Sequence, residues 1–113
     1  MDIVFTTEVE TELGSLPRRE FDSFVRAFEK LVVEGEGLRF PHCSQVRGSQ
    51  RLRELRPRRG RSRWRAFYAR IGAVMVVAGI GPEANDDPTG FRRAVAAAEV
   101  RLATVQKERG ERT

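Results

Sequence analysis

The sequence of 113 residues has very little of the chemistry that small proteins use for cross-linking or metal binding. It contains one cysteine and one histidine, so no internal disulfide and no ordinary four-ligand zinc site can form. No apolar run approaches the roughly 20 residues that span a bilayer, which excludes a membrane helix. The first residues lack a basic leader followed by a long apolar segment, so we expect a cytoplasmic protein. We also expect it to hold no metal and no small-molecule cofactor.

Length and composition indicate one domain spanning residues 1–113. Hydrophobic residues make up 40% of the chain and charged residues 33%, which supplies one small core and argues against disorder. No internal repeat and no low-complexity linker divides the chain. The polar residues 106–113 are expected to form a frayed tail.

Positive charge is concentrated in one block of the sequence. Residues 47–70 contain ten arginines and a single acid, Glu54, whereas residues 1–46 are net acidic and residues 71–113 are balanced. The planar arginine fork suits phosphate and can stack on bases. This block predicts a polyanion-binding face with nucleic acid as the first candidate. A solvated surface, or a face covered by an acidic partner, is the alternative.

The first third of the chain predicts a strand followed by two helices. Residues 3–5 are typical of a short strand, and Thr7 with Glu10 matches a capping box that opens a helix. Pro17 suits the first turn of a second helix, and Gly35 suits its end. Apolar residues of this second helix recur with a helical period; they are Phe21, Phe24, Val25, Phe28, Leu31 and Val32.

The remainder predicts three strands and a last helix. Residues 35–50 contain many glycines and no regular pattern, so we expect an irregular segment. Strands are expected at 52–56, 62–70 and 73–78, with turns at 57–60 and at Gly72, then a loop over 79–87 without hydrophobic support. Asp87 is expected to cap a helix starting at Pro88 or Thr89. The order β-α-α-β-β-β-α predicts an α+β fold of two layers, an antiparallel sheet covered by the helix hairpin.

Several local strings, taken in order, resemble the RelE/HigB superfamily of bacterial toxins, nearest to its phage-derived Gp49-like branch. The resemblance covers roughly residues 3–105. The strings that carry it are Leu31–Gly35 with Leu38–Pro41, Arg51–Arg56, Trp64–Tyr68, the apolar strand 73–78 and Arg93–Ala94.

The resemblance implies the toxin of a type II toxin–antitoxin pair with a two-layer RelE-like fold. Members of this superfamily are usually metal-independent endoribonucleases that cut messenger RNA on the ribosome and so block translation. The implied partners are the ribosome, its messenger RNA and a cognate antitoxin, either a helix-turn-helix or an acidic helical protein.

One segment departs from the branch and keeps other functions open. Residues 78–88 carry three acids and no cation where relatives place basic residues, and Phe91 lies near a catalytic aromatic position but lacks a hydroxyl. A non-catalytic toxin of the same fold, such as a ParE-like gyrase inhibitor or a ribosome-binding inhibitor, is therefore one alternative. A plain RNA- or DNA-binding domain is another.

Four residues are candidates for the chemistry of RNA cleavage. Arg65 matches the strand arginine that contacts the scissile phosphate in the family, and arginine stabilises phosphorane charge well. Arginine is a poor proton carrier, so His42, Tyr68 and Glu54 are the candidates for proton transfer. Each also has an ordinary structural interpretation: a loop residue for His42, a core-edge aromatic for Tyr68 and a partner of arginines for Glu54.

The remaining basic block supplies the predicted contacts to nucleic acid. Arg53 and Arg56 are expected to bind phosphate, the turn arginines to give long-range attraction, and Trp64 either to stack on a base or to pack. The full set of predicted binding residues is Arg51, Arg53, Arg56, Arg58, Arg59, Arg61, Arg63 and Trp64.

Overall fold

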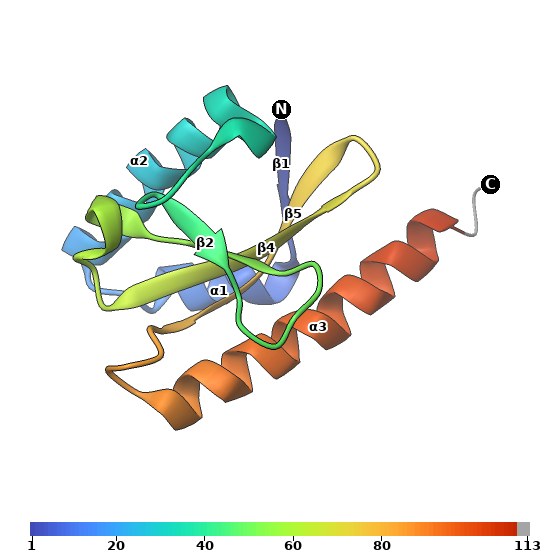
Figure 1. Ribbon diagram of the computed structural model, residues 1–113. Coiled ribbons are helices and arrows are strands. Elements are labelled where there is room, and N and C mark those ends of the chain that lie inside the picture. The colour runs from blue at the N-terminus through green and yellow to red at the C-terminus, as the bar shows by residue number, and fades with distance from the viewer. Residues whose placement is uncertain (111–113) are drawn as a thin grey trace.

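The computed structural model describes residues 1–110, which form five strands and three α-helices around one sheet (Figure 1). The elements are β1 (Asp2–Phe5), α1 (Thr7–Gly14), α2 (Arg18–Glu34), β2 (Cys43–Gln45), β3 (Arg53–Leu55), β4 (Trp64–Ile71), β5 (Val74–Pro82) and α3 (Pro88–Gly110), with short 3-10 helices η1 (Gly35–Gly37) and η2 (Pro57–Gly60). The strand order is β1-β5-β4-β3-β2. The predicted α+β class is confirmed. The sheet is mixed rather than antiparallel throughout, because β1 runs parallel to β5.

Helices cover both faces of the sheet, whereas the sequence predicted two layers with all the cover on one face (Figure 1). On one face α1 and α2 bury Val9, Phe24 and Phe28 against side chains that include Tyr68 of β4. On the other face α3 buries Ala98 and Leu102 against a second set of strand residues. The physical reason is that β4 and β5 are buried along nearly their whole length on both sides. A sheet centre of this kind has to be covered twice.

The strand β5 continues through residues predicted to be loop. The sequence predicted a loop over 79–87, but Gly79 and Gly81 both lie in the ladder opposite β4. A Cβ added to Gly81 would lie 2.4 Å from the Cβ of Ala94, and one added to Gly79 would lie 3.2 Å from the Cβ of Ala98. The glycines therefore allow α3 to approach β5 closely. Packing against Ala94 and Ala98 of α3 takes the place of the hydrophobic side chains that this part of the strand lacks.

Two further predictions were wrong in their boundaries. The segment predicted to be irregular contains a short strand, β2, which pairs antiparallel with β3 at the edge of the sheet. The predicted frayed tail is helical as far as Gly110, because α3 continues past the sheet. The last three residues of that predicted tail, 111–113, lie outside the described residues.

The helix starts differ by one residue in one case and are confirmed in the other. The side chain that caps α1 is Thr6, whose hydroxyl accepts from the backbone N–H of Val9, and Thr7 is already helical. Asp87 caps α3 as predicted, accepting from the N–H of Gly90 at 3.0 Å. Both are the side-chain caps expected where the first helical N–H groups have no partner.

The predicted apolar stripe of α2 is only half buried. Phe24, Phe28 and Leu31 are in the core, whereas Phe21, Val25 and Val32 keep between 37% and 43% of their surface exposed. The sheet therefore covers the centre of the stripe and leaves its edge open. Among residues 1–110, no helix has the length and apolarity needed to cross a membrane.

Gly81→Ala should destabilise the protein because the new methyl group collides with Ala94 in a packed interface. We expect the free energy of unfolding to fall by about 1–3 kcal/mol, measured by urea denaturation. Gly37→Ala is the matched control, since nothing lies within 4 Å of its added Cβ. Equal stability of the two variants would contradict the close approach of α3 to β5.

Candidate nucleic-acid interface

The connection between β3 and β4 has an unusual backbone that displays two arginines. Arg58 and Arg59 adopt left-handed conformations, with φ of 55° and 60°, and Gly60 follows with φ of 90°. Left-handed backbone is costly for residues with a Cβ, so the surroundings must hold it. Glu20 of α2 does part of this, since its carboxylate accepts from the Ser62 hydroxyl at 2.9 Å and from Arg58 at 3.2 Å. The connection is thereby tied to α2.

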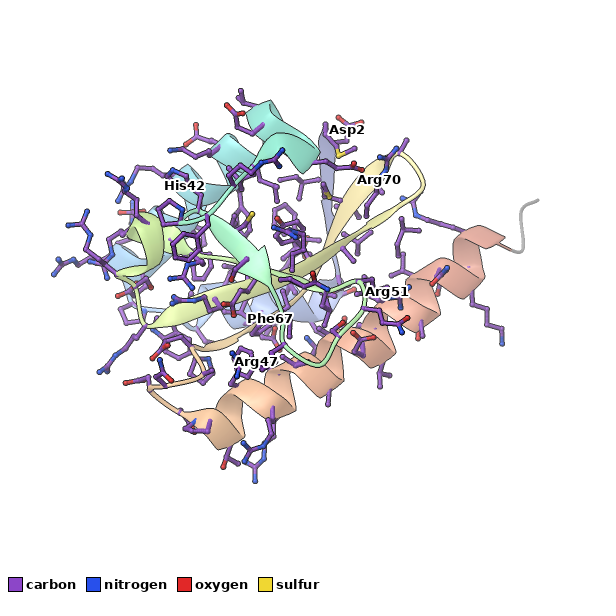
Figure 2. The ribbon with its side chains drawn as sticks, in the orientation of Figure 1. Asp2, His42, Arg47, Arg51, Phe67 and Arg70 are labelled. Atoms are coloured by element: carbon purple, nitrogen blue, oxygen red, sulfur yellow. The ribbon has the colours of Figure 1, made fainter. Side chains whose placement is uncertain are left out.

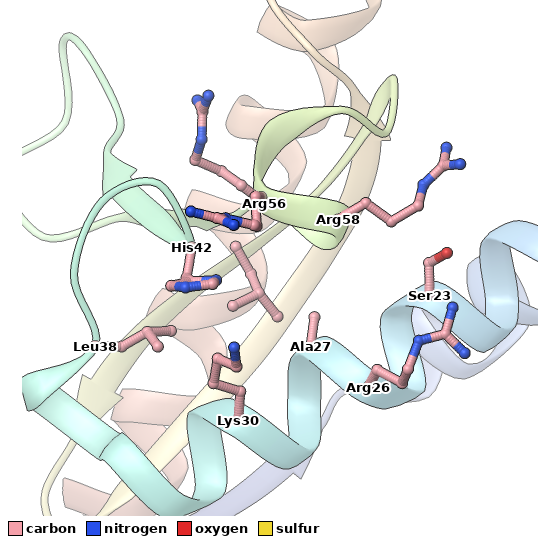
Figure 3. Close-up of a pocket in the computed structure, with 10 residues that line it drawn as sticks. Ser23, Arg26, Ala27, Lys30, Leu38, His42, Arg56 and Arg58 are labelled. Carbon is pink, nitrogen blue, oxygen red and sulfur yellow. The ribbon is translucent and has the colours of Figure 1, made fainter.

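A cationic cavity of about 220 Å³ lies between α2, the segment before β2 and this connection (Figure 3). Five cations line it and no acid does. The lining residues are Ser23, Arg26, Ala27, Lys30, Leu38, His42, Leu55, Arg56, Arg58 and Arg59. A concave site walled by cations of one sign attracts and concentrates anions. We call it the α2–η2 pocket.

The cations of the α2–η2 pocket fall into a paired and an unpaired group. Arg58 is committed to Glu20, and Arg56 contacts Glu54 at 3.5 Å. Arg26, Lys30 and Arg59 are exposed and make no ion pair within residues 1–110. The unpaired group therefore has its donors available for an incoming anion, while the paired group shapes the walls.

His42 brings the only imidazole of the chain into this pocket. Partial burial lowers the pKa of His42 below its ordinary value, and the charges of Lys30 and Arg59 lower it further, against a smaller opposing effect of Glu34. At neutral pH the ring is therefore neutral and can accept a proton. The sequence placed His42 in a loop, and the structure shows that this loop forms a wall of the pocket.

Glu54 is held among polar partners. Its carboxylate accepts from the Ser44 hydroxyl at 2.9 Å and contacts Arg56 at 3.5 Å. Arg56 in turn donates through Nε to the carbonyl of Pro41 at 3.1 Å. The two side chains thus orient each other at the rim of the sheet, which is the structural interpretation considered for Glu54 from the sequence.

Arg65 lies inside the protein, with 3% of its surface exposed. Its Nη1 donates to the carbonyls of Ser62 at 2.7 Å and Trp64 at 3.0 Å, and its Nη2 donates to Gly60 at 3.5 Å. Burial and the nearby charge of Arg56 lower the pKa of Arg65, and Glu54 opposes this with its carboxylate 4.0 Å from Nε. This geometry favours a role in which Arg65 positions the β3–β4 connection, rather than one in which Arg65 contacts phosphate directly.

Tyr68 is a core residue with 2% of its surface exposed. It packs with the side chains of α1 and α2, and burial, followed by hydrogen bonding to Cys43, raises the pKa of its hydroxyl while Arg53 opposes the shift. A phenol whose pKa is raised in this way does not ionise near neutrality. Arg53 donates to the Cys43 sulfur at 3.3 Å, so its guanidinium is also partly engaged.

The structure separates the basic block that the sequence treated as one face. Figure 2 shows His42 on the side of α2 and Arg51 on the side of α3. Arg51 contacts Gln106 and Glu99 of α3, Arg63 pairs with Asp86 at 3.4 Å, and Arg61 donates to the carbonyl of Arg58. Trp64 is partly buried and packs against the α2 side of the core. Only Arg56, Arg58 and Arg59 of the predicted binding set reach the α2–η2 pocket.

Sequence reasoning missed two cations of this pocket. Arg26 and Lys30 lie one helical turn apart on α2, on the side opposite its apolar stripe, and were not among the candidate binding residues predicted from the sequence. Their spacing of four residues could have suggested a shared face, but nothing in the sequence indicated that η2 would come to lie against them. Within residues 1–110, no group of three or more histidine, cysteine or acidic side chains could hold a metal ion.

The fold and this cationic pocket define a small α+β domain with a cavity lined by five cations and no acid. Residues 11–79 match the model of the family described as phage derived protein Gp49-like (DUF891), so the chain belongs to this family of toxin-like proteins. The match covers α2, both 3-10 helices and the strands β2 to β4, and every residue that lines the α2–η2 pocket lies within it. The chain matches no curated protein and no solved structure in the same comparisons.

Arg65→Ala should destabilise the connection between β3 and β4, and this loss of stability should be measurable without any ligand. The substitution leaves buried carbonyls without donors, so we expect a loss of about 2–4 kcal/mol in the free energy of unfolding, measured by urea denaturation. Arg63→Ala is the control, because its exposed pair with Asp86 contributes little, about 0.5 kcal/mol or less. A fully stable Arg65→Ala variant would show that the guanidinium does not support the connection.

The titration of His42 should report the charges that line the α2–η2 pocket. We expect its midpoint, followed by NMR of the single imidazole, to lie below the ordinary value of 6.5. Lys30→Gln and Arg59→Gln should each raise it, because each removes a charge that disfavours protonation.

The same shift has a consequence for stability. Between the folded pKa and 6.5 the unfolded chain binds more protons, so the free energy of unfolding should rise with pH across that window and level off above it. His42→Gln should remove this component. A midpoint that does not move in Lys30→Gln would contradict the electrostatic explanation.

Proposed function

We propose that the protein is the toxin of a type II toxin–antitoxin pair, of RelE/HigB type, that cuts messenger RNA on the ribosome in the cytoplasm. The observation that carries the proposal is the α2–η2 pocket, in which five cations and the imidazole of His42 line one cavity. Membership of a family of toxin-like proteins supports the biological role. The pocket supports the chemistry, because phosphate recognition and proton transfer need these two kinds of group together.

The reaction that fits this pocket needs no metal. The 2′-oxygen of a ribose attacks the adjacent phosphorus, and the bond from phosphorus to the 5′-oxygen of the next nucleotide breaks. His42 accepts the proton of the 2′-hydroxyl and the leaving 5′-oxygen takes a proton from water, so the products are a 2′,3′-cyclic phosphate and a 5′-hydroxyl. Arg59 and Lys30, which have no partner within residues 1–110, stabilise the charge that develops on the phosphorane.

The other residues predicted for catalysis take supporting roles in this proposal. Arg65 holds the carbonyls of the β3–β4 connection, and Glu54 orients Arg56 at the edge of the pocket. Tyr68 stays in the core. Much of the acceleration comes from alignment of the message by the ribosome, which accounts for the small number of proton carriers in the chain.

The proposed partners are the ribosome with its messenger RNA and a cognate antitoxin. An antitoxin that presents acidic side chains to the α2–η2 pocket would neutralise Arg26, Lys30 and Arg59. Such a complex forms at rates that fall as ionic strength rises.

The nuclease should leave new RNA ends inside translated messages. After brief induction in a bacterial host, we expect ends that carry a 5′-hydroxyl, so they should be captured by ligation only after treatment with a polynucleotide kinase. His42→Gln should abolish them, and Arg59→Ala should reduce them at least tenfold, since removal of one such donor costs about 10²–10³ in rate. Arg92→Ala removes the same charge from the exposed start of α3 and is the matched control.

The outcomes separate the nuclease from its alternative. Ends that persist at wild-type level in His42→Gln would remove this residue from the chemistry. Growth arrest without new ends would overturn the nuclease and favour a non-catalytic inhibitor of gyrase or of the ribosome. The acidic segment 83–87 favours that second candidate, because it places Asp86 rather than a cation beside Arg63.

A further inference from the structure

Phe40 is an exposed aromatic residue in a cationic setting. Its side chain is 70% exposed, although phenylalanine is among the most commonly buried residue types. The guanidinium carbon of Arg56 lies 4.9 Å from the centroid of its ring, within cation–π distance. Arg56 donates to the Pro41 carbonyl and pairs with Glu54, so the guanidinium that covers one face of the Phe40 ring is held in place. The rest of the ring is open to solvent.

A second cationic cavity lies on the other side of the segment that carries Phe40. It has a volume of about 290 Å³, and Arg39, Arg53 and Arg70 line it together with Glu36. Arg70 and Glu36 form an ion pair, which leaves the cavity net positive. Leu38 lines both this cavity and the α2–η2 pocket, Arg39 lines only this cavity, and His42 lines only the α2–η2 pocket. Phe40 follows Arg39 and precedes His42 along the chain, so its exposed ring is flanked by residues of both cavities, although it lines neither itself.

We propose that Phe40 is the stacking platform for an unpaired base of single-stranded RNA, with backbone phosphates on either side of that base held in the two cavities. The proposal rests on the proposed function for RNA as the ligand, and it adds the strandedness of the substrate and the residue that selects it. A base inside a duplex already has both faces covered, so only a single strand can offer a free face to the ring. Base–aromatic stacking is the usual way in which such strands are gripped between phosphate contacts.

The surroundings of the ring favour a nucleic acid over a protein partner. A protein-docking surface usually places further apolar side chains around an exposed aromatic. Here Arg39 precedes the ring, Arg56 lies against it and His42 follows two residues later. The exposed apolar side chains Phe21, Val25 and Val32 belong to α2 and line neither of the two cationic cavities.

The test measures binding of a short single-stranded RNA whose riboses are 2′-O-methylated, so that it cannot be cut. One position at a time carries 2-aminopurine, whose fluorescence is quenched when it stacks. Phe40→Leu keeps an apolar side chain but removes the π face, and we expect affinity to fall about 5- to 100-fold with loss of quenching at one position. Phe40→Trp should retain both. Val33→Ala, at another strongly exposed apolar residue, should bind like the wild type.

Salt dependence distinguishes stacking from phosphate contact. Phe40→Leu should leave the slope of log affinity against log salt unchanged, whereas Arg59→Ala should reduce it by about 0.7 for one lost phosphate contact on a single strand. Binding of a fully paired RNA duplex should be the same for Phe40→Leu and the wild type, because the duplex offers no free base.

Three results would overturn the stacking proposal. They are wild-type affinity and quenching in Phe40→Leu, equal loss of single-strand and duplex binding, and loss of a protein partner without loss of RNA binding. Since the methylated strand cannot be cleaved, these results do not depend on nuclease activity. Position-specific quenching in a protein that makes no cuts would retain the platform and reject the nuclease.

Discussion

One buried guanidinium determines the shape of the surface on which the proposed activity depends. From inside the protein, Arg65 donates hydrogen bonds to the carbonyls of Gly60, Ser62 and Trp64. From the α2 side, the carboxylate of Glu20 accepts from the Ser62 hydroxyl and so ties the same connection to α2. Between these two attachments Arg58 and Arg59 are kept in left-handed backbone that neither would adopt readily in a free loop. Because a buried charge and its acceptors are costly to separate, the pocket has a defined form before any ligand arrives.

The arginines of this protein therefore divide by what they touch rather than by where they fall in the sequence. Arg65 and Arg58 donate to protein oxygens and shape the pocket, whereas Arg59, Arg26 and Lys30 make no ion pair within residues 1–110. In the proposed function, the cations of this pocket attract the RNA. The paired arginines then decide where its phosphate binds, next to the imidazole of His42.

Much of the architecture followed from patterns that depend on short-range physics. The helical period of Phe24, Phe28 and Leu31, the cap at Asp87 and the apolar strands were readable because burial and capping leave local signals. The continuation of β5 through Gly79 and Gly81 was not readable, since a glycine that allows close helix packing looks like a glycine that breaks a strand. The third layer was missed because the packing of α3 on β4 and β5 joins parts of the chain that are distant in sequence and leaves no local signal.

The amino-acid sequence by itself determined the charge of the protein, its single imidazole and the order of its elements apart from β2, because these depend on composition and on neighbours along the chain. Only the tertiary structure decided which cations are free. Residues 47–70 looked like one basic face, yet Arg51 lies against α3 and Arg65 is inside the protein. Arg59 lines the same pocket as Lys30, which belongs to a helix that ends at Glu34. Sites of this kind are made by long-range contacts, and no local signal encodes which side chains those contacts bring together.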